Sequence, residues 1–179
     1  MVDVSRVAED IYMIDEVLYS IPKMGSVYLI DEGKKVLIDA GPTTSAHIIL
    51  DGIKEAGVRP EDIDYLIVTH IHLDHAGGAG FLLKYMPKAR VIVHPRGAKH
   101  LVNPEKLVRS VIEHQGEEAM ARDGEVVPIE EHRVQSAYGG DVIELSDKQA
   151  LTFIYAPGHV PHEICLYESR NGGLFVGMQ

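Results

Sequence analysis

The sequence predicts a layered α/β domain in which two β-sheets pack together. Short apolar runs separated by turns open the chain, helical patterns fill its middle, and apolar runs of strand character return near its end. This order differs from the regular strand–helix alternation of a doubly wound parallel sheet. The chain has 179 residues, 45% of them apolar, so we expect a single domain over residues 1–179 with a sizeable core.

Three strands are expected in the first part of the chain, over residues 10–15, 25–31 and 34–41. The stretch 31–34, Asp-Glu-Gly-Lys, is typical of a tight hairpin, so the second and third strands should pair antiparallel.

The next element is a helix over residues 43–57, because apolar residues recur there at helical spacing. Thr43 or Thr44 is expected to cap its start, and Gly57 follows its end.

The run 63–70 is almost continuously apolar, which favours a strand buried on both faces. A short helix over 77–87, stopped by Pro87, and a strand over 89–94 follow. From residue 96 to about 122 the pattern is helical, with a break at Asn103–Pro104. We expect the region of about 104–140 to be a helical insertion over one end of the sandwich. Four closing strands are expected, at 141–145, 150–158, 163–169 and 172–177.

The composition limits the partners and the location that we expect. The net charge is −10 and the pI is about 5.4, which argues against a nucleic acid or an anionic membrane as the main partner. The start lacks the pattern of a signal peptide and the chain has no long apolar span, so we expect a cytoplasmic protein that acts on a small molecule. Cys165 is the only cysteine, which excludes a metal cage of thiolates within this chain.

Four residues of metal-ligand type follow the strand that ends at Thr69, namely His70, His72, Asp74 and His75. Residues two apart in an extended segment point to the same side, so the first two histidines can face one point. The glycine pair at 77–78 permits the chain to bend, which would turn the aspartate and the third histidine toward a second point. Imidazole and carboxylate donors together suit zinc, and iron or manganese as well.

The stretch "THIHLDHAGG", residues 69–78, resembles the His-x-His-x-Asp-His signature of the metallo-β-lactamase superfamily. Residues 37–42, "LIDAGP", and 156–167, "APGHVPHEICLY", are similar to two further segments of that family. The resemblance implies a four-layer αββα sandwich of two mixed sheets, with one or two zinc ions at one edge. It implies a first metal site from His70, His72 and His159, and a second site that begins with Asp74 and His75.

The resemblance also implies roles for supporting residues. We expect Asp39 to accept a hydrogen bond from a ligand histidine and so fix its tautomer, with Thr69 beside it at the strand end. A turn cap before Gly41 is the alternative for Asp39. His162 is expected to be structural and not a metal ligand.

The sequence departs from the family at its end. Met178 stands where the family usually has an aspartate that bridges two metals, and the last strands and helices of the family have no counterpart. The chain is therefore either a truncated form of a longer protein or a natural departure from the family. We expect a weak second metal site, and a homo-oligomer that covers the incomplete second sheet.

The function that the resemblance implies is that of a metal-dependent hydrolase of the glyoxalase II type. A metal-bound hydroxide would attack a thioester, ester or lactone carbonyl, and Asp74 would orient the water or accept its proton. Two alternatives stay open at this point: an iron-dependent domain that oxidises sulfur compounds, and a truncated metal-binding form without catalysis.

Overall fold

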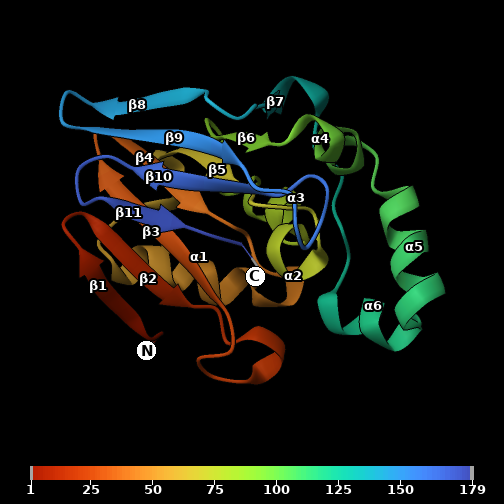
Figure 1. Ribbon diagram of the computed structural model, residues 1–179. Coiled ribbons are helices and arrows are strands. Elements are labelled where there is room, and N and C mark those ends of the chain that lie inside the picture. Colours follow the sequence, from red (N-terminus) through yellow and green to blue (C-terminus); the bar gives the residue numbers. More distant parts are fainter. Residues whose placement is uncertain (1, 178–179) are drawn as a thin grey trace.

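The computed structural model describes residues 2–177, which form two packed β-sheets with helices along the outer face of the larger sheet (Figure 1). The larger sheet has the strand order β1-β2-β3-β4-β5-β6-β7. Its strands are β1 (Val4–Ala8), β2 (Ile11–Asp15), β3 (Ser26–Glu32), β4 (Lys34–Ile38), β5 (Ile63–Ile67), β6 (Arg90–Val93) and β7 (Val134–Ser136). Strands β1 to β4 pair antiparallel and β4 to β7 pair parallel, so this sheet is mixed.

The smaller sheet is antiparallel throughout the described strands and has the order β11-β10-β9-β8. Its strands are β8 (Val142–Ser146), β9 (Gln149–Tyr155), β10 (Ile164–Glu168) and β11 (Gly173–Phe175). They match the four closing strands that the sequence predicts, and the two-sheet α/β class is confirmed.

The helices of the described chain lie between the strands of the larger sheet in sequence. They are α1 (Ala46–Glu55), α2 (Leu73–Ala76), α3 (Ala79–Leu82), α4 (Pro95–Val102), α5 (Glu105–Gln115) and α6 (Glu117–Asp123). Short 3₁₀ turns occur at Leu18–Ser20, Thr43–Ser45, Pro60–Asp62 and Glu131–Arg133. The predicted break at Asn103–Pro104 separates α4 from α5. The region 104–140, expected to be a helical insertion, is α-helical only as far as Asp123. Its last part contains β7, which pairs with β6 in the larger sheet.

Two apolar layers hold the structure together. Between the sheets, Ile30, Ile38 and Ile67 from the larger sheet meet Phe153 and Leu166 from the smaller one. On the opposite face of the larger sheet a second layer packs against the helices, and its members include Leu29, Leu37, Ile49, Ile53 and Leu82. The central strands of the larger sheet, β5 among them, are thus covered on both faces, as the apolar run at 63–70 predicts.

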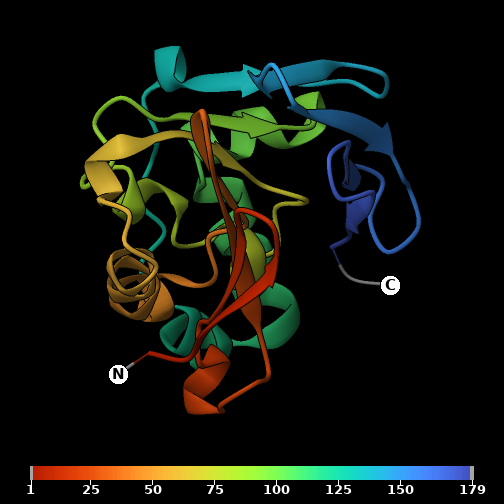
Figure 2. The same ribbon diagram turned by 90° about the vertical axis from the view of Figure 1, so that its left-hand side faces the viewer.

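The outer face of the smaller sheet is uncovered in the described residues (Figure 2). Val142, Ile154, Tyr167 and Leu174 are 41–55% exposed there. The described part of the chain therefore has three layers, helices and two sheets, where the resemblance implies four. The expected self-association through this face stays a prediction.

Two strands were not expected from the sequence. Most residues of β1 and β7 are exposed, and each of the two strands lies at an edge of the larger sheet. Backbone pairing with β2 and β6 holds them there, so neither carries the apolar alternation that marks a half-buried strand.

The expected cap of the first helix is wrong. Thr43 donates its hydroxyl to the carbonyl oxygens of Gly77 and Glu125, and Thr44 donates to that of Arg122. A 3₁₀ turn at 43–45 leads into α1 without a side-chain cap. The threonines instead bind the start of α1 to two distant segments, which local sequence cannot reveal.

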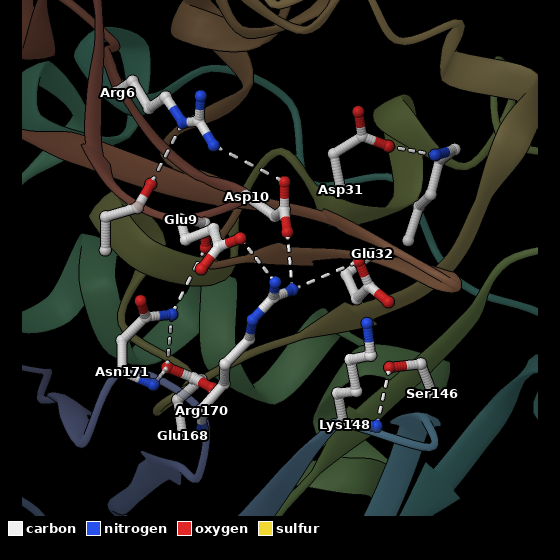
Figure 3. Close-up of polar contacts among 12 residues, drawn as sticks. Arg6, Glu9, Asp10, Asp31, Glu32, Ser146, Lys148, Glu168, Arg170 and Asn171 are labelled. Carbon is white, nitrogen blue, oxygen red and sulfur yellow. Dashed lines mark hydrogen bonds and ion pairs between the residues drawn. The ribbon is translucent and has the colours of Figure 1, made fainter.

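A polar cluster joins the two sheets at one end of the sandwich (Figure 3). Arg170, in the β10–β11 turn, lies 2.7 Å from Asp10 in the β1–β2 turn and 3.3 Å from Glu32 at the end of β3. Glu9 also pairs with this guanidinium. Asp39 and Thr69 come after the carboxyl ends of β4 and β5, at the opposite end of the sandwich from this cluster. The cluster therefore joins the sheets at the end remote from the histidines.

None of the described helices has both the length and the apolar character that a membrane crossing requires.

Candidate metal centre

The histidine segment begins where β5 ends, between two other loops. The backbone stays extended as far as His72, whose φ and ψ are −63° and 149°, and α2 starts at the next residue. The sequence predicted a bend at Gly77–Gly78 and did not predict this helical turn. Both glycines have negative φ, so their conformational freedom is not what the bend uses. Gly78 provides space instead, because an added Cβ would lie 2.6 Å from the carbonyl oxygen of Ala40.

Three histidines from two distant segments converge beside this turn. His159, in the β9–β10 loop, places Nε2 2.9 Å from Nδ1 of His72. One ring nitrogen of each of His70, His72 and His159 lies within 4.8 Å of the other two. His70 is fully buried, His72 is half-buried and His159 is exposed, so the group opens to solvent on one side. Three imidazoles with an open position are typical of a catalytic zinc site.

A relay of hydrogen bonds sets the tautomer of His70. The Thr69 hydroxyl donates to Asp39 at 2.9 Å, so its oxygen accepts from Nδ1 of His70 at 3.2 Å. Nε2 of His70 is then the unprotonated nitrogen. It is buried and has no hydrogen-bond partner among the described residues. A buried lone pair without a partner is costly, and a metal ion would satisfy it.

Burial also keeps the first two histidines neutral. It lowers the pKa of His70 to about 2, and the neighbouring histidines act in the same direction. Burial and the nearby His159 lower the pKa of His72. Neutral imidazole is the form that binds a metal, so the donor set fits a divalent ion such as zinc.

Asp74 and His75 lie beside the three histidines and form a separate pair. Nδ1 of His75 is 2.9 Å from Oδ2 of Asp39, and its Nε2 is 3.9 Å from Oδ2 of Asp74. Burial lowers the pKa of His75, but the hydrogen bond that its ring donates to Asp39 and the charges of both aspartates outweigh it, so the pKa rises to about 9. Within residues 2–177 the pair has no third donor close enough to complete a metal site. The position of Met178 lies outside the described residues.

Asp39 therefore contacts Thr69, which supports His70 of the three-histidine cluster, and also His75 of the neighbouring pair. Its carboxylate accepts from the backbone N–H and the hydroxyl of Thr69 and pairs with Nδ1 of His75. The sequence predicts a hydrogen bond from a ligand histidine to Asp39; the contact with His75 is present, and the role of His75 as a ligand stays a prediction. Asp39 itself has a positive φ of 62°, a strained conformation for a residue with a side chain.

Sequence reasoning missed Glu16. This residue is 3% exposed, and Oε2 has no hydrogen-bond partner among the described residues. Burial is the main cause that raises the pKa of its carboxyl group, to about 8. Glu16 lines a cavity of about 340 Å³ together with Asp39, Asp74 and His75. Its position directly after β2, like that of Asp39 after β4, is a signal that could have identified it.

The remaining histidines lie outside the cluster. His162 accepts a hydrogen bond from the backbone N–H of Ile71 at 3.4 Å, and burial lowers its pKa to about 4. His94 stacks on Tyr155, and His47 contacts Phe81.

Comparison with known proteins decides the family. The model of the metallo-beta-lactamase superfamily matches residues 21–177. This chain belongs to the metallo-beta-lactamase superfamily. The members of that superfamily that it resembles include an acyl-coenzyme A thioesterase from Gallus gallus, 30% identical over 93% of this chain and 61% of the relative. They also include an N-acyl homoserine lactonase from Bacillus cereus, 27% identical over 69% of this chain and 40% of the relative.

A solved structure agrees with this assignment. A mutant of a metallo-beta-lactamase from Cronobacter sakazakii superposes with a TM-score of 0.71 and 26% identity, over 97% of this chain and 62% of that one. The chain thus spans less than two thirds of the length of each of these superfamily members.

Proposed function

We propose that this chain carries the metal centre of a hydrolase that cleaves thioesters, esters or lactones. The observations that support the proposal most directly are the convergence of His70, His72 and His159 and the buried Nε2 of His70, which has no hydrogen-bond partner among the described residues. Membership of the superfamily supports a metal-dependent reaction. We propose zinc as the metal.

The residues of the chain have separate tasks in this reaction. His70, His72 and His159 would hold a divalent ion, which would supply a Lewis acid to activate water and polarise the substrate carbonyl. Asp39 and Thr69 keep the proton of His70 on Nδ1, so that Nε2 stays available. We propose Asp74 as the catalytic residue that orients the attacking water and accepts its proton, since its charge acts on His72 and its side chain lines the cavity together with His75.

The substrate class follows from the relatives and from two motifs. A thioesterase and a lactonase, as their names state, act on bonds to a carbonyl carbon. The resemblance of residues 69–78 and 156–167 to hydrolases of the glyoxalase II type supports the same chemistry. We propose an uncharged acyl group for the 340 Å³ cavity, since Leu18, Tyr28 and Phe175 line it next to the acidic residues.

An iron-dependent redox reaction is less favoured by the donor set. Mononuclear iron oxygenases commonly use two histidines and one carboxylate, whereas the cluster here offers three imidazoles. Metal analysis of protein made without added metal separates the two, because an excess of iron with oxygen uptake would favour the redox reaction.

The test is a panel of acyl thioesters, aryl esters and lactones offered to zinc-loaded protein. We expect cleavage of at least one class, its loss in His72→Ala, and full activity in His132→Ala, whose side chain is on the surface. Stoichiometric zinc binding with no cleavage of any class would contradict the hydrolase proposal and favour a non-catalytic metal-binding form.

A further inference from the structure

The loop between β9 and β10 is fixed at its base but open at its tip. Ala156 donates its backbone N–H to the carbonyl of Glu163 at 3.1 Å, and Ile164 donates to the carbonyl of Thr69 at 3.0 Å. These bonds hold the two ends of the loop. At the tip, His159 is exposed, and a Cβ added to Gly158 would meet no atom within 4 Å. Packing at Gly158 therefore does not fix the direction of the next residue, His159.

Two side chains from other elements bind this loop close to His159. The carbonyl oxygen of Pro161 accepts from Nη1 of Arg96 at 3.2 Å and from the hydroxyl of Tyr155 at 3.1 Å. Arg96 lies in the first turn of α4, and Tyr155 is the last residue of β9. One carbonyl, two residues after the histidine, is thus held from two directions.

His94 links the two donors. Its Nδ1 accepts from the backbone N–H of Arg96 at 3.2 Å, which caps the start of α4. Its ring also stacks on Tyr155, with centroids 5.1 Å apart and planes 20° from parallel. His94 therefore contacts both residues whose side chains reach Pro161.

A third contact attaches the loop to the histidine segment itself. His162 accepts from the backbone N–H of Ile71, the residue between His70 and His72. The contacts of Pro161 and His162, which both follow His159, thus hold the loop beside the segment that carries the first two histidines. Figure 1 shows this loop at the same end of the molecule as α2.

We propose that Arg96 and Tyr155 are positioning residues for metal binding, which hold the Pro161 carbonyl so that His159 faces His70 and His72. This inference rests on the proposed metal centre. The two residues are not among the metal ligands that we propose. They act through the loop, so removing them lowers the metal affinity and leaves the fold of the metal-free protein unchanged.

The experiment compares Arg96→Gln, Tyr155→Phe and the double variant with the parent. Zinc affinity is measured by competition with a chelator, and the absorption of the cobalt-substituted protein reports the number of ligands. We expect each single variant to bind zinc about 10-fold more weakly and the double variant about 100-fold more weakly, the range found for residues that orient metal ligands. Arg96→Lys should fall between the parent and Arg96→Gln.

Two variants serve as matched controls. Arg109→Gln removes an exposed arginine from α5, and Tyr138→Phe removes the hydroxyl of a tyrosine that is 60% exposed. We expect both to bind zinc within twofold of the parent. Urea unfolding of every metal-free variant should match the parent.

The proposal would be overturned if Arg96→Gln, Tyr155→Phe and the double variant bound zinc like the controls. So would weaker binding accompanied by an equivalent loss of metal-free stability, because the role would then be structural. His159→Ala separates this from the proposed function. If His159→Ala keeps the parent's zinc affinity, the proposed metal centre is wrong. If His159→Ala loses zinc while the Arg96 and Tyr155 variants keep it, only the proposed positioning role is wrong.

Discussion

Asp39→Asn tests the hydrogen-bond arrangement on which the metal centre depends. Asp39 is 8% exposed and accepts three hydrogen bonds, two from Thr69 at 2.8 and 2.9 Å and one from Nδ1 of His75 at 2.9 Å. Asparagine has the same shape but only one acceptor oxygen. That oxygen can still accept from Thr69, and the amide NH₂ then faces the N–H of His75, where two donors oppose each other.

The magnitude follows from these contacts. A hydrogen bond to a charged group contributes about 1.5–3 kcal/mol and a neutral one about 1 kcal/mol. Losing the bond to His75 and weakening the two bonds to Thr69 should lower the free energy of unfolding by about 2–4 kcal/mol. Asparagine also removes the charge that, together with the hydrogen bond, raises the pKa of His75 to about 9, so the pKa of His75 should fall. The weaker acceptor for Thr69 should lower zinc affinity at the three histidines about 10- to 100-fold.

The assay is urea unfolding of the metal-free protein together with a zinc titration. Asp51→Asn is the matched control, since Asp51 is an exposed residue of α1 that forms a surface ion pair with Lys54. We expect the control to change the free energy of unfolding by less than about 1 kcal/mol. An Asp39→Asn protein that unfolds and binds zinc like this control would refute the assigned role of Asp39.

Three further predictions test other parts of the site. Thr69→Val removes the acceptor that holds the Nδ1 proton of His70, so zinc affinity at the three histidines should fall about 10- to 100-fold by chelator competition; unchanged affinity would exclude the relay. The pKa of Glu16 rises on folding from 4.5 to about 8, so the folded state binds the extra proton and stability falls as pH rises between these values. The change that Glu16→Gln makes in the free energy of unfolding of the metal-free protein should therefore be about 3 kcal/mol more stabilising at pH 8 than at pH 5, as measured by urea unfolding. An equal change at both pH values would contradict this. Gly78→Ala should destabilise by roughly 1–3 kcal/mol, because its Cβ would meet a backbone carbonyl at 2.6 Å; Gly173→Ala, whose Cβ would meet no atom within 4 Å, is the control, and equal stability of the two would show that the site can relax.

The sequence by itself determined the elements that carry strong periodic patterns and the residues of the histidine motif. The apolar strands, α1, the break before α5 and the resemblance that names His159 are all local properties of the chain, because periodicity and motif spacing are read along it. The sequence did not predict the edge strands β1 and β7, because they are held by backbone pairing with a neighbour and bury few apolar side chains.

Only the tertiary structure decided how the site is assembled. The threonines expected to cap a helix bind distant carbonyls, the glycine pair provides space for a packed backbone, and Glu16 is buried beside residues far away in sequence. The contacts of Arg96 and Tyr155 with Pro161 likewise join three separate elements. Each of these is a long-range contact, and its energy depends on which segments the fold brings together and not on the spacing of residues along the chain.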